Sequence, residues 1–239
     1  MEAELQELID NCVQEIEYTV LEYEKYLEDK FNYYSLNNSD IFYSYLNKKT
    51  ADARNSCLSS LLSCFKKICI IAGIPIYRDI LSVVSRSAKT YIFSAFTQYK
   101  SVYTSLYSKA KERLSEDFLR ETLMRDILSS RKNIRDFMSG REDIVISVGK
   151  RSFKLSSYMK IVVEQEISSK FNLALFKHAK GNGAIGIRIS DHNTKTKLCE
   201  KYEGKTYYFA NNGLDALKEG LPPFHINCKH FIIPVYAHV

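Results

Sequence analysis

Apolar residues recur every three or four positions through most of the first 135 residues, which is the spacing of one face of an α-helix. Over residues 4–34 the remaining positions are largely acidic. This stretch predicts one amphipathic helix whose inward face consists of Leu5, Ile9, Cys12, Ile16, Val20, Tyr23 and Leu27. The turn-forming residues 37–40 are expected to end it.

Two further long helices are predicted after this break. One covers about residues 50–72, because Gly73 and Pro75 follow its apolar positions in the order that ends helices. The next covers about residues 77–114 and carries a basic outer face. Ser115 is followed by two acidic residues, which is the chemistry of a helix start, so a shorter helix is predicted from there to about residue 130.

The pattern changes near Gly140, where runs rich in β-branched and aromatic residues begin to alternate with turns. A helix is predicted over residues 154–179, and a short one near residues 213–219. The predicted strands are residues 143–148, 184–190, 206–209 and 231–236. We therefore expect an α+β fold with two domains, an all-helical one over residues 1–140 and a small α+β one over residues 141–239.

Charge is divided unevenly along the chain. Residues 1–46 contain eleven acidic and two basic side chains, a net charge of −9, and since the whole chain carries +6 the remainder carries +15. Two blocks of opposite sign indicate two surfaces with different partners, a basic one facing nucleic acid and an acidic one facing a basic protein; solvated helix faces give the same pattern. The basic residues that are candidates for non-specific contact with phosphates are Arg131, Lys132, Arg135, Arg141, Lys150 and Arg151.

Several classes of protein are disfavoured by what the sequence lacks. Its longest apolar stretch, residues 68–76, is too short to span a bilayer, and the acidic N-terminal segment lacks the pattern of a secretory signal. The six cysteines do not form the dense framework of secreted domains, so a reducing compartment is expected. A Gly-rich phosphate loop, a nucleophile elbow and a zinc-protease helix motif are all missing, so most large enzyme classes lack their usual signature.

Side chains able to bind a metal gather near the C-terminus, where two prolines precede a turn and an apolar run follows it. Pairing of the predicted strands would bring this turn against an earlier loop, and the two segments together contain His192, Cys199, His225, Cys228 and His230. Four of these five side chains would complete a tetrahedral site for a structural zinc ion. The alternative is a buried corner in which hydrogen bonds to the backbone satisfy the same groups.

The order of these motifs resembles one known family. A helix is followed by the strand and loop at residues 185–192, by Cys199, by the segment at residues 202–207, and by the run Leu-Pro-Pro-Phe-His-Ile-Asn-Cys-Lys-His. Residues 145–236 thereby resemble the C-terminal domain of phage minor head proteins, the Mu F-like head-morphogenesis family. Two positions depart from the family pattern: Tyr202 stands where a second cysteine is common, and Ile226 stands where a proline is usual.

The resemblance implies a structural protein of a tailed-phage virion, without enzymatic activity, made in the host cytoplasm and placed inside the capsid head. The implied partners are the portal protein, with several copies of the chain around it, packaged double-stranded DNA, and a major capsid or scaffold protein; no membrane is involved. The alternative is an enzyme of a nuclease-like or ADP-ribosyltransferase-like effector type. In that case Glu203 would be the acid to test.

Overall fold

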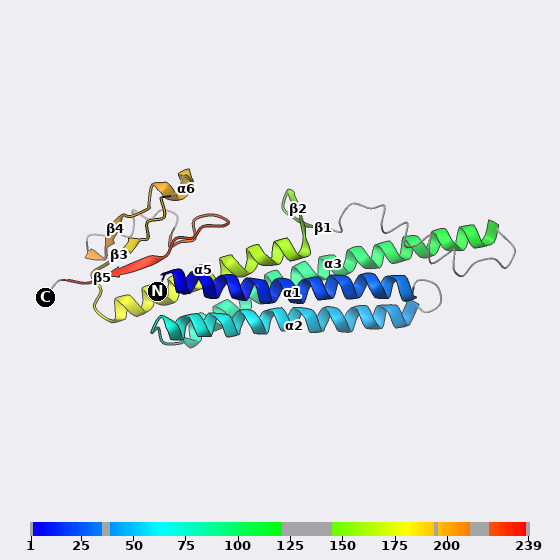
Figure 1. The fold of residues 1–239 in the computed structure, drawn as a ribbon, viewed down its shortest axis with the longest axis horizontal. Helices are drawn as coiled ribbons and strands as arrows, with labels where there is room; N and C mark the ends of the chain where they lie inside the picture. The colour runs from blue at the N-terminus through cyan, green and yellow to red at the C-terminus, as the bar shows by residue number, and fades with distance from the viewer. Residues whose placement is uncertain (1, 35–38, 121–144, 194–195, 211–219, 238–239) are drawn as a thin grey trace. The chain divides into compact units, whose positions relative to one another are not determined.

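The structure is a computed structural model that describes residues 2–34, 39–120, 145–193, 196–210 and 220–237. Its first half contains three long helices, α1 (Glu2–Tyr34), α2 (Ser39–Ile71) and α3 (Arg78–Arg120) (Figure 1). The prediction for the first helix is confirmed, and all seven of its predicted inward residues are buried. None of the helices in the described ranges has both the length and the apolar character needed to cross a membrane.

The part of the chain after residue 144 mixes short strands with helices, which confirms the predicted α+β class. A hairpin comes first, and a single long helix separates it from a three-stranded antiparallel sheet of order β4-β3-β5. The elements in chain order are β1 (Val145–Val148), β2 (Arg151–Lys154), α5 (Leu155–Gly181), β3 (Gly186–Ile189), α6 (Lys197–Glu200), β4 (Thr206–Tyr208) and β5 (Ile232–Val235). The one-turn helix α6 was not predicted.

Two predicted helix boundaries are wrong. Helix α2 begins at Ser39 rather than near residue 50, because Phe42 and Leu46 are buried and extend the inward face of the helix toward its start. Helix α3 continues through Ser115 to its end at Arg120, since a serine and two acids are tolerated in a helix that no proline or glycine interrupts. The remainder of that predicted helix and the one near residues 213–219 lie outside the described residues.

The chain forms two compact units, each assembled from segments that are far apart in the sequence. Unit 1 contains Met1–Gln14, Leu58–Thr90 and Lys160–Val239, and unit 2 contains Glu15–Cys57 and Tyr91–Met159. The predicted domain boundary near residue 140 falls among residues 121–144, which the structure does not describe, so that boundary stays a prediction.

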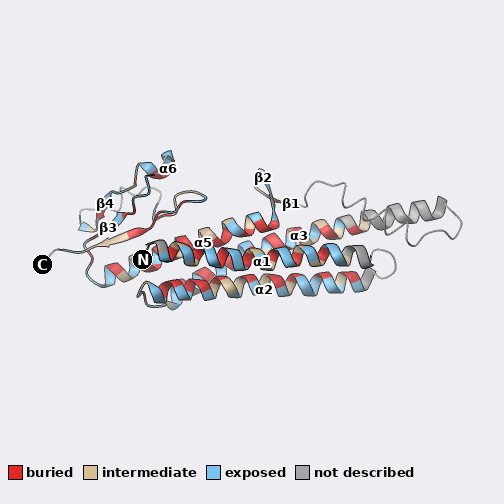
Figure 2. Ribbon diagram, viewed as in Figure 1, coloured by how far each residue is buried: buried red, intermediate tan, exposed pale blue. Residues whose placement is uncertain are grey.

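Aromatic side chains join the parts of α1, α2 and α3 that belong to unit 2, and buried positions run along each of these helices as stripes (Figure 2). Phe42 of α2 stacks on Tyr107 of α3 with ring centroids 4.3 Å apart. The Thr50 hydroxyl donates to the Leu46 carbonyl at 2.6 Å, so the buried hydroxyl of Tyr23 donates to Thr50, 2.7 Å away. The polar end of an otherwise apolar ring is therefore satisfied inside the helical core.

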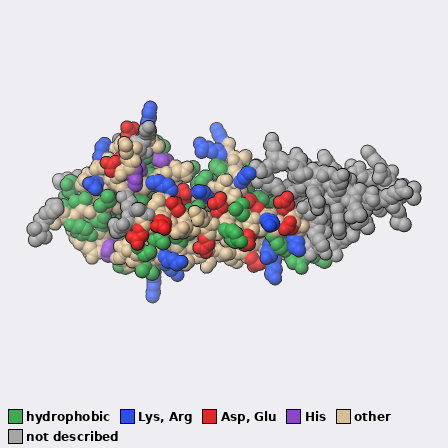
Figure 3. Space-filling view, viewed as in Figure 1, with side chains coloured by type: hydrophobic (Ala, Val, Ile, Leu, Met, Phe, Trp, Pro, Cys, Tyr) green, Lys and Arg blue, Asp and Glu red, His purple; other side chains and the backbone are tan. Residues whose placement is uncertain are grey.

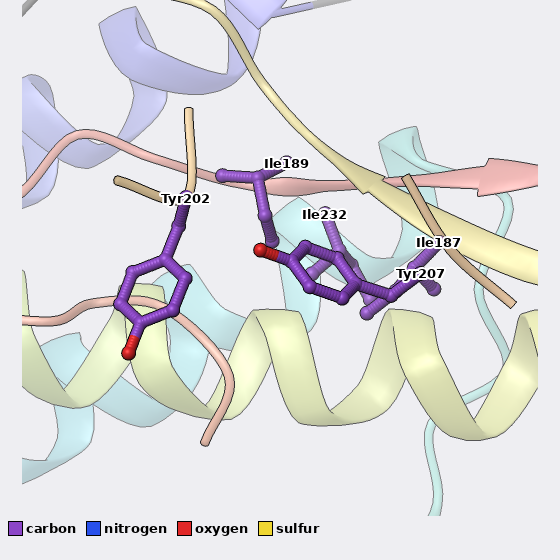
Figure 4. Packing of buried hydrophobic residues seen from close by; sticks show 5 residues of the cluster. All are labelled: Ile187, Ile189, Tyr202, Tyr207 and Ile232. Atoms are coloured by element: carbon purple, nitrogen blue, oxygen red, sulfur yellow. The ribbon is translucent and has the colours of Figure 1, made fainter. Parts of the chain in front are cut away.

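In unit 1 the three-stranded sheet packs against α5, as the close view in Figure 4 shows. The buried cluster consists of Ile187, Ile189, Tyr202, Tyr207 and Ile232, and Leu175 and Phe176 of α5 pack against it. Pro234 pairs with Ile187 on the edge strand β5, where a residue without an N–H group costs little.

Gly186 allows the central strand of this sheet to approach its neighbour. A Cβ atom at this position would lie 2.6 Å from the carbonyl oxygen of Tyr207 in β4, and that distance is far inside van der Waals contact. The close pairing of β3 with β4 thus depends on the missing side chain. This pairing matters because β3 leads directly into the loop that carries the first candidate ligand.

Candidate metal centre

The end of β3 and the residues before β5 are joined by a reciprocal pair of hydrogen bonds. Ser190 donates its backbone N–H to the Phe231 carbonyl at 2.8 Å, and Phe231 donates its own N–H to the Ser190 hydroxyl at 2.9 Å. These bonds extend the β3–β5 ladder by one step and place His192 beside His230, with ring centroids 4.9 Å apart. The predicted approach of the two segments is therefore present in the structure.

Helix α6 positions the first cysteine. Its single turn buries Cys199, while the N–H groups of Tyr202 and Glu203 both donate to the Cys199 carbonyl, at 2.8 Å and 3.0 Å. The turn then reverses at Gly204, whose φ of +68° lies in the left-handed region that favours glycine. This local structure carries the chain from the buried thiol to Glu203 within four residues.

Three of the five predicted ligands form one group, and a fourth, His225, adjoins it through Cys199. The Sγ atom of Cys199 is 3.1 Å from Nε2 of His225, and the Sγ atom of Cys228 is 3.3 Å from Nδ1 of His230. The ligand atoms of Cys199, Cys228 and His230 all lie within 4.8 Å of one another, and these three residues are buried. Two thiols and one imidazole, with a second imidazole against one of the thiols, are the ligand types of a structural zinc site.

Backbone and amide groups fix the orientation of His225. Its Nδ1 atom lies 2.7 Å from the carbonyl oxygen of Ile226, and since a carbonyl only accepts, Nδ1 carries the proton. In the neutral imidazole, Nε2 is then the unprotonated nitrogen, and it faces Cys199. The turn itself is closed by a bond from the Cys228 N–H to the His225 carbonyl at 3.1 Å, and the same carbonyl accepts from the side chain of Gln165 in α5 at 3.1 Å.

A carboxylate fixes the orientation of His230. Its Nε2 atom lies 3.1 Å from Oε1 of Glu203, so Nε2–H donates there and Nδ1 presents its lone pair to Cys228. Burial lowers the pKa of His230, and the hydrogen bond to Glu203 only partly opposes this shift, so the imidazole is held neutral. Glu203 also accepts the backbone N–H of His192 and is only 9 % exposed.

His192 takes a different place from the one predicted for a ligand. Its Nε2 atom lies 2.8 Å from the hydroxyl of Ser190, and its ring is exposed and meets His230 edge-on. The space-filling view shows histidine side chains at the surface beside α6 (Figure 3).

Asn172 in the middle of α5 is a key residue of this region that sequence reasoning missed. Its side chain is fully buried and donates to the carbonyls of Pro222 and His230, at 3.0 Å and 3.3 Å, while its oxygen accepts the N–H of Ile232 at 2.9 Å. One amide thereby holds both ends of the 222–232 segment. The signal in the sequence was a single asparagine next to the inward face of an otherwise apolar helix.

The other predicted site residues do not join this cluster. Lys150 and Arg151 are exposed at the β1–β2 turn, and the remaining candidates for phosphate contact, Arg131, Lys132, Arg135 and Arg141, lie outside the described residues.

Comparisons of the chain with protein-family models, with curated proteins and with solved structures find no match.

Proposed function

We propose that the chain is a non-enzymatic minor head protein of a tailed phage, located inside the capsid at the portal. In this proposal the C-terminal region is a closed structural module, and the helical segments provide surfaces for partners. The proposal joins the resemblance of residues 145–236 to the Mu F-like family with the arrangement of the residues that carry that resemblance.

The observation that carries the proposal is the convergence of the resembling motifs on one closed cluster. The loop after β3 and the adjoining helix α6 meet the turn before β5, which lies more than twenty residues further along the chain, at Cys199, His225 and His230. Motifs that a family shares for structural reasons are expected to assemble in this way, because each one supplies a contact that the others need.

The burial and hydrogen bonds of Glu203 favour a structural role for this residue over a catalytic one. An effector enzyme would present this acid to a substrate in an open cleft. Here the carboxylate is 9 % exposed, and its Oε1 atom accepts hydrogen bonds from the His192 backbone and the His230 ring. An acid held by two such bonds orients a histidine and is poorly placed to exchange protons with a substrate.

The charged faces provide the proposed contacts with partners. Helix α1 exposes seven carboxylates, an acidic surface suited to a basic face of the portal protein: Glu4, Glu7, Asp10, Glu15, Glu22, Glu28 and Asp29. Exposed Lys150 and Arg151 at the β1–β2 turn lie in the basic remainder of the chain, which is proposed to face packaged DNA.

The test is co-assembly with the portal protein encoded in the same genome. We expect the two proteins to co-purify when co-expressed, and to be found together in purified heads by mass spectrometry. A triple change of Glu7, Glu28 and Asp29 to lysine should weaken the association, while a control that reverses the exposed Lys66 and Lys67 of α2 should not. Heads that lack the protein, or a portal that never retains it, would refute the proposal.

A further inference from the structure

We infer that Cys199, His225, Cys228 and His230 bind one zinc ion in a closed tetrahedral site that joins helix α6 to the turn before β5. The inference goes beyond the proposed role in the head and does not depend on it. It stands on the positions of four ligand atoms and on the groups that orient them.

Two sulfur–nitrogen separations in the cluster are close to those in a tetrahedral zinc site. With Zn–S bonds of about 2.3 Å and Zn–N bonds of about 2.0–2.1 Å, a sulfur and a nitrogen ligand lie about 3.6 Å apart. The two observed sulfur–nitrogen pairs are 3.1 Å and 3.3 Å apart. In addition, the ligand atoms of Cys199, Cys228 and His230 all lie within 4.8 Å of one another. His225 lies outside this group of three and adjoins it through Cys199, so its ring moves toward Cys228 and His230 when the ion binds.

Each histidine already presents an unprotonated nitrogen to a sulfur. The Ile226 carbonyl takes the Nδ1 proton of His225, and the Glu203 carboxylate takes the Nε2 proton of His230. A zinc-bound histidine typically donates its other N–H to a carbonyl or carboxylate, which fixes the ring and strengthens it as a ligand. Both orienting groups are therefore in place for coordination through Nε2 of His225 and Nδ1 of His230.

The site is structural because its four positions are all filled by the chain. Two cysteines and two histidines leave no vacant position for water or substrate, as in structural zinc sites generally. His192 is not taken as the fourth ligand because its Nε2 atom lies 2.8 Å from the Ser190 hydroxyl, whereas Nε2 of His225 lies 3.1 Å from the Cys199 sulfur. It flanks the centre and offers a matched control, since it is a histidine in contact with the cluster that is not a ligand.

The same contacts permit two competing states that the experiment must separate. In one state the cysteines are reduced, no metal is bound, and each thiol donates a hydrogen bond to its histidine. In the other, Cys199 and Cys228 are joined by a disulfide. In the zinc-bound state both thiols are protected from alkylation in the native protein. In the hydrogen-bonded state the protein contains two thiols and no metal. In the disulfide state neither cysteine reacts as a thiol, even after the protein is unfolded.

The experiment measures zinc per chain in the full-length protein, purified with a reductant and without chelator, by elemental analysis. We expect one zinc per chain in the wild type, in His192→Asn and in the distant control Cys69→Ala, and loss of zinc in Cys199→Ser, His225→Asn and Cys228→Ser. Since a ligand variant can fail to fold, the wild-type chain is also loaded with Co²⁺ in place of zinc. Its absorption spectrum should show sulfur-to-cobalt charge transfer and tetrahedral cobalt bands.

Three results would overturn the inference. A metal-free wild type whose chain also gives no tetrahedral cobalt spectrum would assign the cluster as a hydrogen-bonded corner. A Cys199–Cys228 disulfide in the peptide map would assign it as a covalent link. Zinc that survives in His225→Asn but is lost in His192→Asn would show that the ligand set is wrong.

Discussion

Buried polar groups are held differently in unit 2 and in the C-terminal part of unit 1. In unit 2 the Tyr23 hydroxyl bonds to Thr50 within a long, periodic apolar interface, so each polar contact is one small contribution among many. In the C-terminal part the strands are three or four residues long, and the buried polar groups converge on one cluster and one asparagine. Stability is spread out in the first region and concentrated in the second.

A similar contrast separates the buried thiols of the long helices from those of the C-terminal part. Burial among apolar side chains raises the pKa of Cys57 to about 12 and that of Cys69 to about 11, so these thiols act as small apolar groups. Cys199 and Cys228 are equally buried, yet each lies against a histidine nitrogen. Cysteine therefore fills space in the helices and forms a link in the C-terminal part. A small hydrophobic core commonly needs such an additional cross-link for stability.

The largest predicted effect is the loss of the proposed metal. Removing zinc with a strong chelator, or making Cys228→Ser, should speed amide hydrogen exchange at Ser190 and Ile232 by about 1,000-fold, which corresponds to about 4 kcal/mol of lost protection. Exchange in α1 and α2 between residues 15 and 57 should change little. If metal removal changed the exchange protection of both regions by the same factor, stability would not be concentrated in the C-terminal part.

The second effect is expected at Asn172. Replacing it with alanine leaves the Pro222 and His230 carbonyls and the Ile232 N–H without their buried partner, at a cost of about 2–4 kcal/mol in the free energy of unfolding. Asn182→Ala, at an exposed asparagine near the end of the same helix, serves as the control. Chemical denaturation of both variants measures the difference, and equal losses would argue against a special role for Asn172.

A smaller effect is expected at the close approach of β3 and β4. Gly186→Ala places a Cβ atom 2.6 Å from the Tyr207 carbonyl, so the strands must separate and the protein should lose about 1–3 kcal/mol. Gly181→Ala is the matched control, because nothing lies within 4 Å of its added Cβ and it ends α5. If both variants melt at the wild-type temperature, the packing of β3 against β4 is looser than described.

The smallest effect is expected in unit 2. Tyr23→Phe removes one buried hydroxyl, while Thr50 keeps its bond to Leu46, so the cost should be about 0.5–1.5 kcal/mol. Tyr18→Phe, at a tyrosine that is 64 % exposed, should be close to neutral and provides the baseline. A loss in Tyr23→Phe as large as that in Asn172→Ala would mean that stability is concentrated in both regions.

The sequence predicted the long helices well because their apolar spacing persists for many turns. The errors lie where a local signal competed with that spacing. Ser115 has the chemistry of a helix start, but the helix continues because nothing before it interrupts the backbone hydrogen bonds. Phe42 and Leu46 extend α2 by repeating its inward face, and their spacing in the sequence is that of a helix.

The sequence predicted which residues come together at the candidate site, but not which ring nitrogen of each histidine faces a sulfur. Strand pairing alone implied that Cys199 and His225 would meet, because β3 and β5 are neighbours. The protonated nitrogen of each histidine depends on where the Ile226 carbonyl and the Glu203 carboxylate lie in space. The choice of His225 over His192 likewise depends on which ring lies against the Cys199 sulfur, so no spacing rule could have selected four ligands from five.

The most direct test of this account is X-ray absorption at the zinc edge of the wild-type protein. The account predicts a first shell of two sulfur atoms at about 2.3 Å and two nitrogen atoms at about 2.0–2.1 Å, with no oxygen ligand. A shell that includes a water oxygen would indicate an open site suited to catalysis. Such a shell, or a protein that binds no zinc at all, would contradict the closed structural centre proposed for the C-terminal part.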